Sequence, residues 1–120
     1  MTVRKILIVE DEFLIRLTLG EALADEGFQV LEAATGPEAL DVLRTRPDVA
    51  LLLTDIHLPG GLNGREVARQ ARGFAPALKV IFMTGRPDAM AEGGTPDEAF
   101  IAKPYLPSQV CATARRLTGF

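Results

Sequence analysis

Residues 49–54 read Val-Ala-Leu-Leu-Leu-Thr, an almost wholly apolar run that ends at Asp55. A strand this apolar is usually covered on both faces, as in a parallel sheet with helices on each side. Four further runs predict the other strands: residues 6–9, 29–33, 78–83 and 99–102. Because helical patterns separate these runs, we expect repeated βα units and a doubly wound α/β fold with a five-stranded parallel sheet.

The segments between the strands carry the helical signals. One helix face is predicted by the i, i+3, i+4, i+7, i+8 spacing of Ile15, Thr18, Leu19, Ala22 and Leu23, with Gly27 as its natural end. Residues 35–38, Thr-Gly-Pro-Glu, have the form of a capping box for a second helix that ends before Pro47. Two later helices are expected over residues 65–72 and 107–117. The helix between them, over residues 87–92, is expected to be short or irregular because Gly-Gly-Thr-Pro follows it.

Length and composition narrow the class of protein. The chain has 120 residues, of which 48% are hydrophobic, so we expect one domain over residues 1–120. Its single cysteine allows no intrachain disulfide, which suits a reducing compartment. A net charge of −3 without a basic stripe argues against a nucleic-acid partner, and no apolar run approaches the roughly 20 residues that span a membrane. A cytoplasmic protein without a signal peptide is the expectation.

Polar residues follow the predicted strands at their carboxyl ends. The first strand is followed by Glu10, Asp11 and Glu12, the third by Asp55, the fourth by Thr84 and the fifth by Lys103. In a doubly wound sheet these ends meet at one edge, where ligands bind. Carboxylates about 4 Å apart repel by on the order of 4 kcal/mol at an effective dielectric of 20, so a cation must offset them. Mg²⁺ favours such oxygen ligands, and a carboxylate can act as a nucleophile toward phosphorus.

Each of these residues also has a purely structural interpretation. Acidic residues after a strand are often helix caps, as Glu10 and Asp11 would be. Thr84 could cap a turn, and Lys103 before a proline could be a solvated surface charge. The functional interpretation depends on their occurring together, each at the same end of a successive strand.

The combination resembles the receiver domain of two-component response regulators over essentially all 120 residues. The matching segments are residues 6–12 (Ile-Leu-Ile-Val-Glu-Asp-Glu), 53–59 (Leu-Thr-Asp-Ile-His-Leu-Pro), 63–64 (Asn-Gly), 83–85 (Met-Thr-Gly) and 103–104 (Lys-Pro). The resemblance implies a flavodoxin-like sheet with strand order 2-1-3-4-5. The loop after Pro59 is one residue longer than the commonest version and resembles the loops of receivers attached to hybrid histidine kinases and of some stand-alone receivers.

The resemblance also implies a role for each matching site residue. Asp55 would be the phosphoacceptor, and Mg²⁺ or Mn²⁺ would be bound by Glu10, Asp11, Asp55 and the backbone carbonyl of His57. Phosphate would be stabilised by Thr84 and Lys103, and the Lys103-Pro104 bond would be cis. Thr84 and Phe100 would form the conformational switch. The side chains of His57 and Arg86 border the path of the attacking water and would influence phosphoryl lifetime.

The function so implied is a signalling switch rather than a turnover enzyme. A histidine kinase or histidine phosphotransfer protein would donate the phosphoryl group, and the chain would act on an unknown target as a monomer or weak dimer. One alternative is a pseudo-receiver or phosphate sink that only docks. An aspartyl phosphohydrolase is a second, although the common pattern needs an Asp where His57 stands. A flavodoxin-like cofactor binder is a third, although Glu10, Asp11 and Glu12 would repel a phosphate.

Overall fold

The computed structural model describes residues 3–86 and 95–119. Within these ranges the chain alternates strands and helices in the order β1 (Lys5–Val9), α1 (Phe13–Asp25), β2 (Gln29–Ala33), α2 (Gly36–Thr45), β3 (Val49–Asp55), α3 (Gly64–Arg72), β4 (Lys79–Thr84), β5 (Glu98–Ala102) and α4 (Pro107–Thr118). Each strand boundary lies within one residue of its prediction. The short helix predicted over residues 87–92 falls outside the described residues, and α4 is the predicted closing helix.

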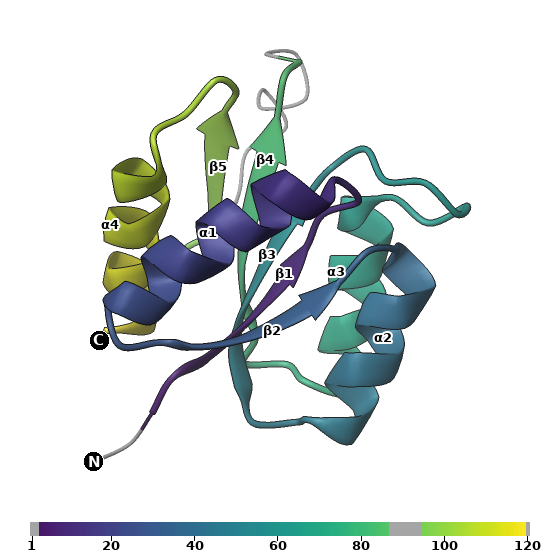
Figure 1. Ribbon diagram of the computed structural model, residues 1–120. Coiled ribbons are helices and arrows are strands. Elements are labelled where there is room, and N and C mark those ends of the chain that lie inside the picture. The colour runs from purple at the N-terminus through teal and green to yellow at the C-terminus, as the bar shows by residue number, and fades with distance from the viewer. Residues whose placement is uncertain (1–2, 87–94, 120) are drawn as a thin grey trace.

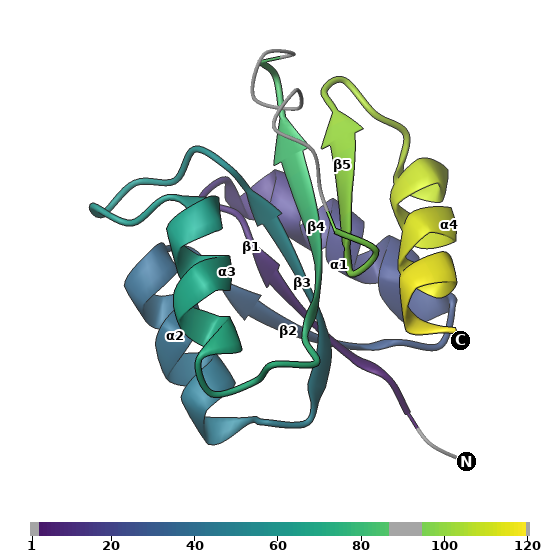
Figure 2. The ribbon, with the colours of Figure 1, turned by 180° about the vertical axis from the view of Figure 1, so that it is seen from behind.

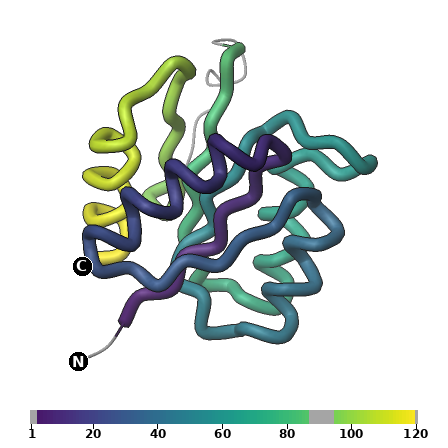
Figure 3. The backbone as a smooth tube through the Cα atoms, in the orientation of Figure 1, coloured from purple at the N-terminus to yellow at the C-terminus, as the bar shows by residue number. Residues whose placement is uncertain are grey.

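The five strands form one parallel sheet with the order β2-β1-β3-β4-β5, which confirms the predicted topology (Figure 1). After β1 the chain forms β2 at one edge, then crosses back to place β3 on the other side of β1 and continues outward (Figure 3). The loops that leave β1 and β3 therefore run to opposite faces of the sheet. The strand order reverses at the carboxyl ends of these two strands, and this is where doubly wound sheets bind ligands.

Helices cover both faces of the sheet. Helices α1 and α4 lie on one face, and α2 and α3 lie on the other (Figure 2). Side chains alternate along β3, so Leu51 and Leu53 pack toward α1 and α4, whereas Leu52 packs toward α2 and α3. This double coverage is the physical reason why β3 is apolar almost throughout.

Helix α1 buries less of its apolar surface than its spacing predicts. Leu19 and Leu23 are fully buried, but Thr18 is exposed, so its prediction on the packed face was wrong. The first turns also expose three large apolar side chains, Phe13, Leu14 and Leu17. Within the described ranges no helix is both long enough and apolar enough to cross a membrane.

The helix ends follow local hydrogen-bonding rules. Gly27 has φ +100°, the left-handed conformation that ends α1 as predicted. Thr35 Oγ1 accepts a hydrogen bond from the Glu38 amide at 3.3 Å, which is one half of the predicted capping box. A complete box occurs at the start of α3 instead. There the Asn63 side chain accepts from the Glu66 amide, and the Glu66 carboxylate accepts from the Asn63 amide.

Candidate functional site

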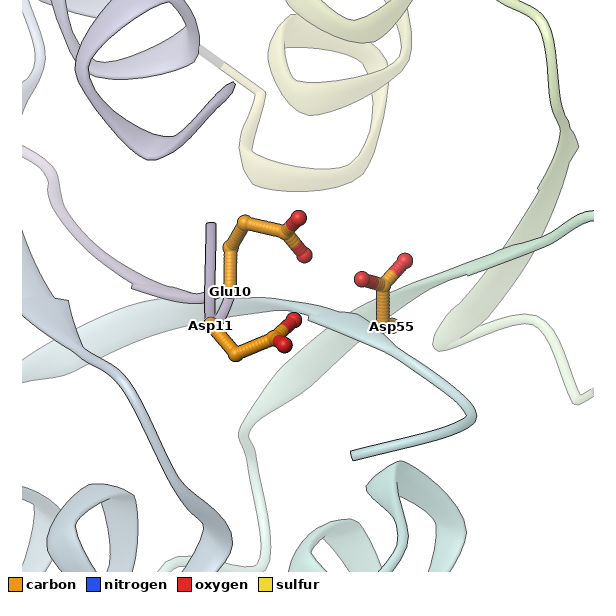
Figure 4. A group of neighbouring side chains, drawn as sticks. All are labelled: Glu10, Asp11 and Asp55. Atoms are coloured by element: carbon orange, nitrogen blue, oxygen red, sulfur yellow. The ribbon is translucent and has the colours of Figure 1, made fainter. Parts of the chain in front are cut away.

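Three carboxylates converge where β1 and β3 end. Glu10 and Asp11 follow β1, and Asp55 is the last residue of β3. One oxygen from each lies within 4.8 Å of the others, and the three side chains point into a common space (Figure 4). Glu10 and Asp55 are only 2% and 5% exposed, whereas Asp11 is exposed. The site is thus a partly buried acidic cluster with one side open to solvent.

The backbone around Asp55 is held by close packing. The Ile56 amide donates to Met83 O at 3.0 Å, and the Gly64 amide donates to Ile56 O at 2.7 Å. A Cβ atom at position 64 would lie 2.1 Å from the carbonyl oxygen of Asp55. The first residue of α3 must therefore lack a side chain, because the helix begins directly against the end of β3.

Glu10 has the most perturbed carboxyl group of the cluster. Burial, a hydrogen bond with Asp55 and the charge of Asp55 raise the pKa of Glu10 from 4.5 to about 8. Its Oε2 atom is buried and accepts no hydrogen bond within the described structure. Burying a carboxylate oxygen without a partner costs desolvation free energy, which a proton or a cation bound to this atom would offset.

Lys103 supplies the nearest positive charge. Its Nζ lies 2.6 Å from Asp55 Oδ1, and its amide donates to Thr84 O at 2.8 Å. Burial alone would lower the pKa of Lys103, but Asp55, Glu10 and Glu12 outweigh it and raise that pKa. The Lys103-Pro104 bond is cis, as the resemblance implied. One ammonium group faces three carboxylates, so the cluster keeps an excess of negative charge.

The donor set fits a divalent cation. Mg²⁺ prefers oxygen ligands and usually takes one or two carboxylates together with waters and phosphate oxygens. None of the described residues donates a hydrogen bond to Glu10 Oε2, and the exposed Asp11 leaves an opening toward solvent. A cation bound by Glu10, Asp11 and Asp55 would satisfy that oxygen and offset the repulsion that Lys103 leaves.

Thr84 lies at the same edge of the sheet but its hydroxyl is engaged locally. Thr84 Oγ1 accepts from the Arg86 amide at 3.0 Å and lies 3.4 Å from Arg86 O. The side chains of His57 and Arg86 are exposed, two residues past Asp55 and Thr84 respectively. Their roles in phosphoryl lifetime stay predictions, as does the ligation of a metal by the His57 carbonyl.

Phe100 is part of an aromatic stack beside the site. Its ring lies 5.2 Å from that of Phe82, on the neighbouring strand β4. The guanidinium of Arg65, from α3, lies 5.2 Å and 5.5 Å from the centroids of Phe100 and Phe82. Phe100 is half-buried, so its ring has packing partners in this conformation. No sequence pattern predicts that Arg65 and Phe82 contact Phe100.

Arg16 is another residue near the site that the sequence did not indicate. It lies in α1, and its Nη1 donates to the backbone carbonyl of Glu10 at 2.6 Å. No motif or periodicity signals this contact, because the guanidinium reaches backward from a helix to a carbonyl.

A model of the response regulator receiver domain matches residues 6–115 of this chain. The chain belongs to the response regulator receiver family. Among curated receiver proteins, sporulation initiation phosphotransferase F of Bacillus subtilis is 41% identical over 67% of this chain and 63% of its own length. The sensor kinase CckA of Brucella abortus is 30% identical over 93% of this chain but only 12% of its own length. The receiver therefore spans only part of these relatives.

Solved receiver structures agree with the fold along nearly the whole chain. A response regulator receiver protein from Sinorhizobium medicae has a TM-score of 0.88 at 26% identity, covering 98% of this chain and 95% of its own. The response regulator TrrA from Thermotoga maritima, solved with Mg²⁺ and BeF, has a TM-score of 0.84 at 28% identity, covering 96% and 99%. The family expected from the sequence is confirmed.

Proposed function

We propose that this receiver domain is a phosphoryl-accepting switch in which Asp55 receives the phosphoryl group in a Mg²⁺-dependent reaction. The observation that carries the proposal is the position of Asp55. It is buried at the end of β3, it faces Glu10 and Asp11 within 4.8 Å, and its Oδ1 lies 2.6 Å from Lys103 Nζ. The Mg²⁺-containing complex of TrrA, a similar receiver, supports the choice of cation.

The chemistry is nucleophilic substitution at phosphorus. A carboxylate oxygen of Asp55 attacks the phosphorus of a phosphohistidine, the phosphorus–nitrogen bond breaks, and the imidazole leaves with a proton from solvent. The product is an acyl phosphate on Asp55. Mg²⁺, when bound, offsets the charge that builds up between the carboxylates and the phosphoryl oxygens. Lys103 is placed to pair with a phosphoryl oxygen, because its ammonium already contacts Asp55.

Thr84 offers a route from the phosphate to the surface. Its hydroxyl contacts the Arg86 backbone, so a rotation of Thr84 toward a phosphoryl oxygen would break the hydrogen bond from the Arg86 amide. Phe82 precedes Thr84 by two residues on β4 and stacks on Phe100. We expect the backbone of residues 85–86 and the Phe100 ring to respond together, changing the partner-binding face.

The phosphodonor protein docks, in this proposal, on the apolar side of the site. A groove of about 620 Å³ is lined by Leu14, Ile15, Thr18, Leu19, Lys103, Pro104, Tyr105 and Pro107. Leu14 and Leu106 are 73% and 69% exposed, so the surface offers unpaired apolar contacts. Lys103 joins this groove to Asp55, and a donor seated there brings its histidine toward the carboxylate. Leu14→Asp should slow transfer from a cognate kinase and leave labelling by a small-molecule donor unchanged; equal rates with the kinase would exclude this surface.

The domain is, in this proposal, a switch and not a turnover enzyme. The acidic cluster, with a bound Mg²⁺, and Lys103 are the groups that would form and hold the acyl phosphate. The common phosphohydrolase pattern requires a second aspartate two residues after the nucleophile, and that position holds His57. A module that only docks would have no need of a buried Glu10 carboxylate whose Oε2 accepts no hydrogen bond from the described residues.

Labelling by a small phosphodonor tests the proposal. Wild type should gain one phosphoryl group from acetyl phosphate with Mg²⁺ and none in excess chelator, measured by intact-mass spectrometry. Asp55→Asn should not be labelled. Asp48→Asn is the matched control, because Asp48 is an exposed aspartate paired with Lys5 away from the site, and it should be labelled like wild type. Unlabelled wild type, alongside a receiver that does label, would overturn the proposal.

A further inference from the structure

Arg16 makes two directed hydrogen bonds, one of them to the backbone of the acidic cluster. Its Nη1 donates to Glu10 O at 2.6 Å, and its Nε donates to Glu32 Oε1 at 2.8 Å. Glu32 lies in β2, so the guanidinium connects α1, the end of β1 and the edge strand. The side chain is only 15% exposed. A planar guanidinium donating in two fixed directions holds its partners more rigidly than an ammonium can.

The contact fixes the peptide from which the site side chains project. The Glu10 amide donates to Ala33 O at 3.1 Å, and the Glu10 carbonyl accepts from Arg16. Both sides of this residue are therefore held. The peptide that Arg16 fixes joins Glu10 to Asp11, two members of the acidic cluster, so a rotation of that peptide would displace both carboxylates.

We infer that Arg16 is a positioning residue for the cation site: by holding the Glu10–Asp11 peptide, it strengthens the binding of Mg²⁺ although it is itself a cation. This inference rests on the proposed function. If Arg16 acted only through its positive charge, it would weaken the binding of Mg²⁺ instead. A positive charge beside an acidic cluster repels a second cation, so its removal would strengthen Mg²⁺ binding. The two roles therefore predict changes of opposite sign.

Calorimetric Mg²⁺ titration of the full chain separates these roles. Arg16→Gln should bind Mg²⁺ about tenfold more weakly than wild type, the lower end of what loss of a supporting hydrogen bond costs a metal site. Arg16→Lys keeps the charge but loses the two-directional donor, and should also bind more weakly. Arg115→Gln is the matched control, because Arg115 also pairs with a glutamate, Glu26, between α1 and α4, and its affinity should match that of wild type.

A second readout needs no metal. In Mg²⁺-free protein, the carbonyl carbon resonance of Glu10 and the amide resonance of Asp11 should move in both Arg16 variants and stay in place in Arg115→Gln. Should Arg16→Gln not fold, Arg16→Lys decides. Failure of wild type to bind Mg²⁺ would refute the proposed function itself. Wild-type binding together with equal or tighter binding by the Arg16 variants would refute this inference alone, as would a lowered melting temperature with unchanged affinity.

Discussion

Replacing Gly64 with alanine should destabilise this protein, although general rules for helices suggest the reverse. Gly64 is the first residue of α3, and its φ is not in the left-handed region. Alanine is favoured over glycine in helices by about 1 kcal/mol, and it also lowers the entropy of the unfolded chain. Judged by backbone conformation alone, Gly64→Ala would be a stabilising change.

The space around Gly64 reverses that expectation. The new Cβ would lie 2.1 Å from Asp55 O and 3.0 Å from the Asp55 carbonyl carbon, both of which are backbone atoms that cannot rotate away. Relieving the overlap costs about 1–3 kcal/mol, and loosening the 2.7 Å hydrogen bond from Gly64 to Ile56 costs about 1 kcal/mol more. Against a gain of about 1 kcal/mol, the net loss is roughly 1–3 kcal/mol.

Urea denaturation followed by circular dichroism measures this loss. Gly20→Ala is the control, because a Cβ at position 20 would meet Val30 and Ile8 at 3.6 and 3.9 Å, which are ordinary contacts. We expect Gly20→Ala to stabilise by about 0.5–1 kcal/mol and Gly64→Ala to destabilise. Since the overlap displaces the backbone of Asp55, acetyl phosphate labelling should also slow in Gly64→Ala. A Gly64→Ala protein as stable as wild type would refute the reasoning from close packing.

Two further predictions concern the charges of the site. The pKa of Glu10 is raised to about 8, so the folded state keeps a proton that the unfolded state releases above pH 4.5. The contribution of Glu10 to metal-free stability is therefore full below pH 4.5 and is lost as the pH rises toward 8, by up to about 1.4 kcal/mol per unit. Melting temperatures in chelator between pH 6 and 8.5 should decline in wild type and stay nearly level in Glu10→Gln; an equal decline would contradict the assignment. Burial and the charges of Asp55 and Glu10 raise the pKa of Tyr105 to about 12. Tyr105 is the sole tyrosine and the chain has no tryptophan, so ultraviolet absorbance reports the titration of this one phenol. Asp55→Asn should lower the pKa of Tyr105. An unchanged pKa would show that the charge of Asp55 does not act on the phenol.

The strands and the position of the acidic cluster could be predicted because both follow from local patterns. The apolar run at residues 49–54 predicts a strand, and Asp55 is the last residue of that strand. Parallel strands then bring their carboxyl ends together without further information. The start of α3 is also predictable in this way, because Asn63 and Glu66 have the same capping-box spacing as Thr35 and Glu38.

Other features depend on tertiary contacts that no local pattern encodes. Thr18 fits the helical spacing but is exposed, since α1 packs mainly through Leu19 and Leu23. The burial of Glu10 and its raised pKa require knowledge of what surrounds it. The contact of Arg16 with a backbone carbonyl cannot be predicted from residue types, because any residue offers a backbone carbonyl.

The acidic cluster also links cation binding to folding. Glu10 and Asp11 come from one end of the sequence and Asp55 from its middle, and they meet only when β1 pairs with β3. An unfolded chain has no such arrangement. A cation that binds the assembled cluster therefore shifts the folding equilibrium toward the native state. At ten times its dissociation constant, the gain is about 1.4 kcal/mol. The ion that serves the chemistry would then also protect the chain from proteolysis, and cellular magnesium would influence how long the protein survives.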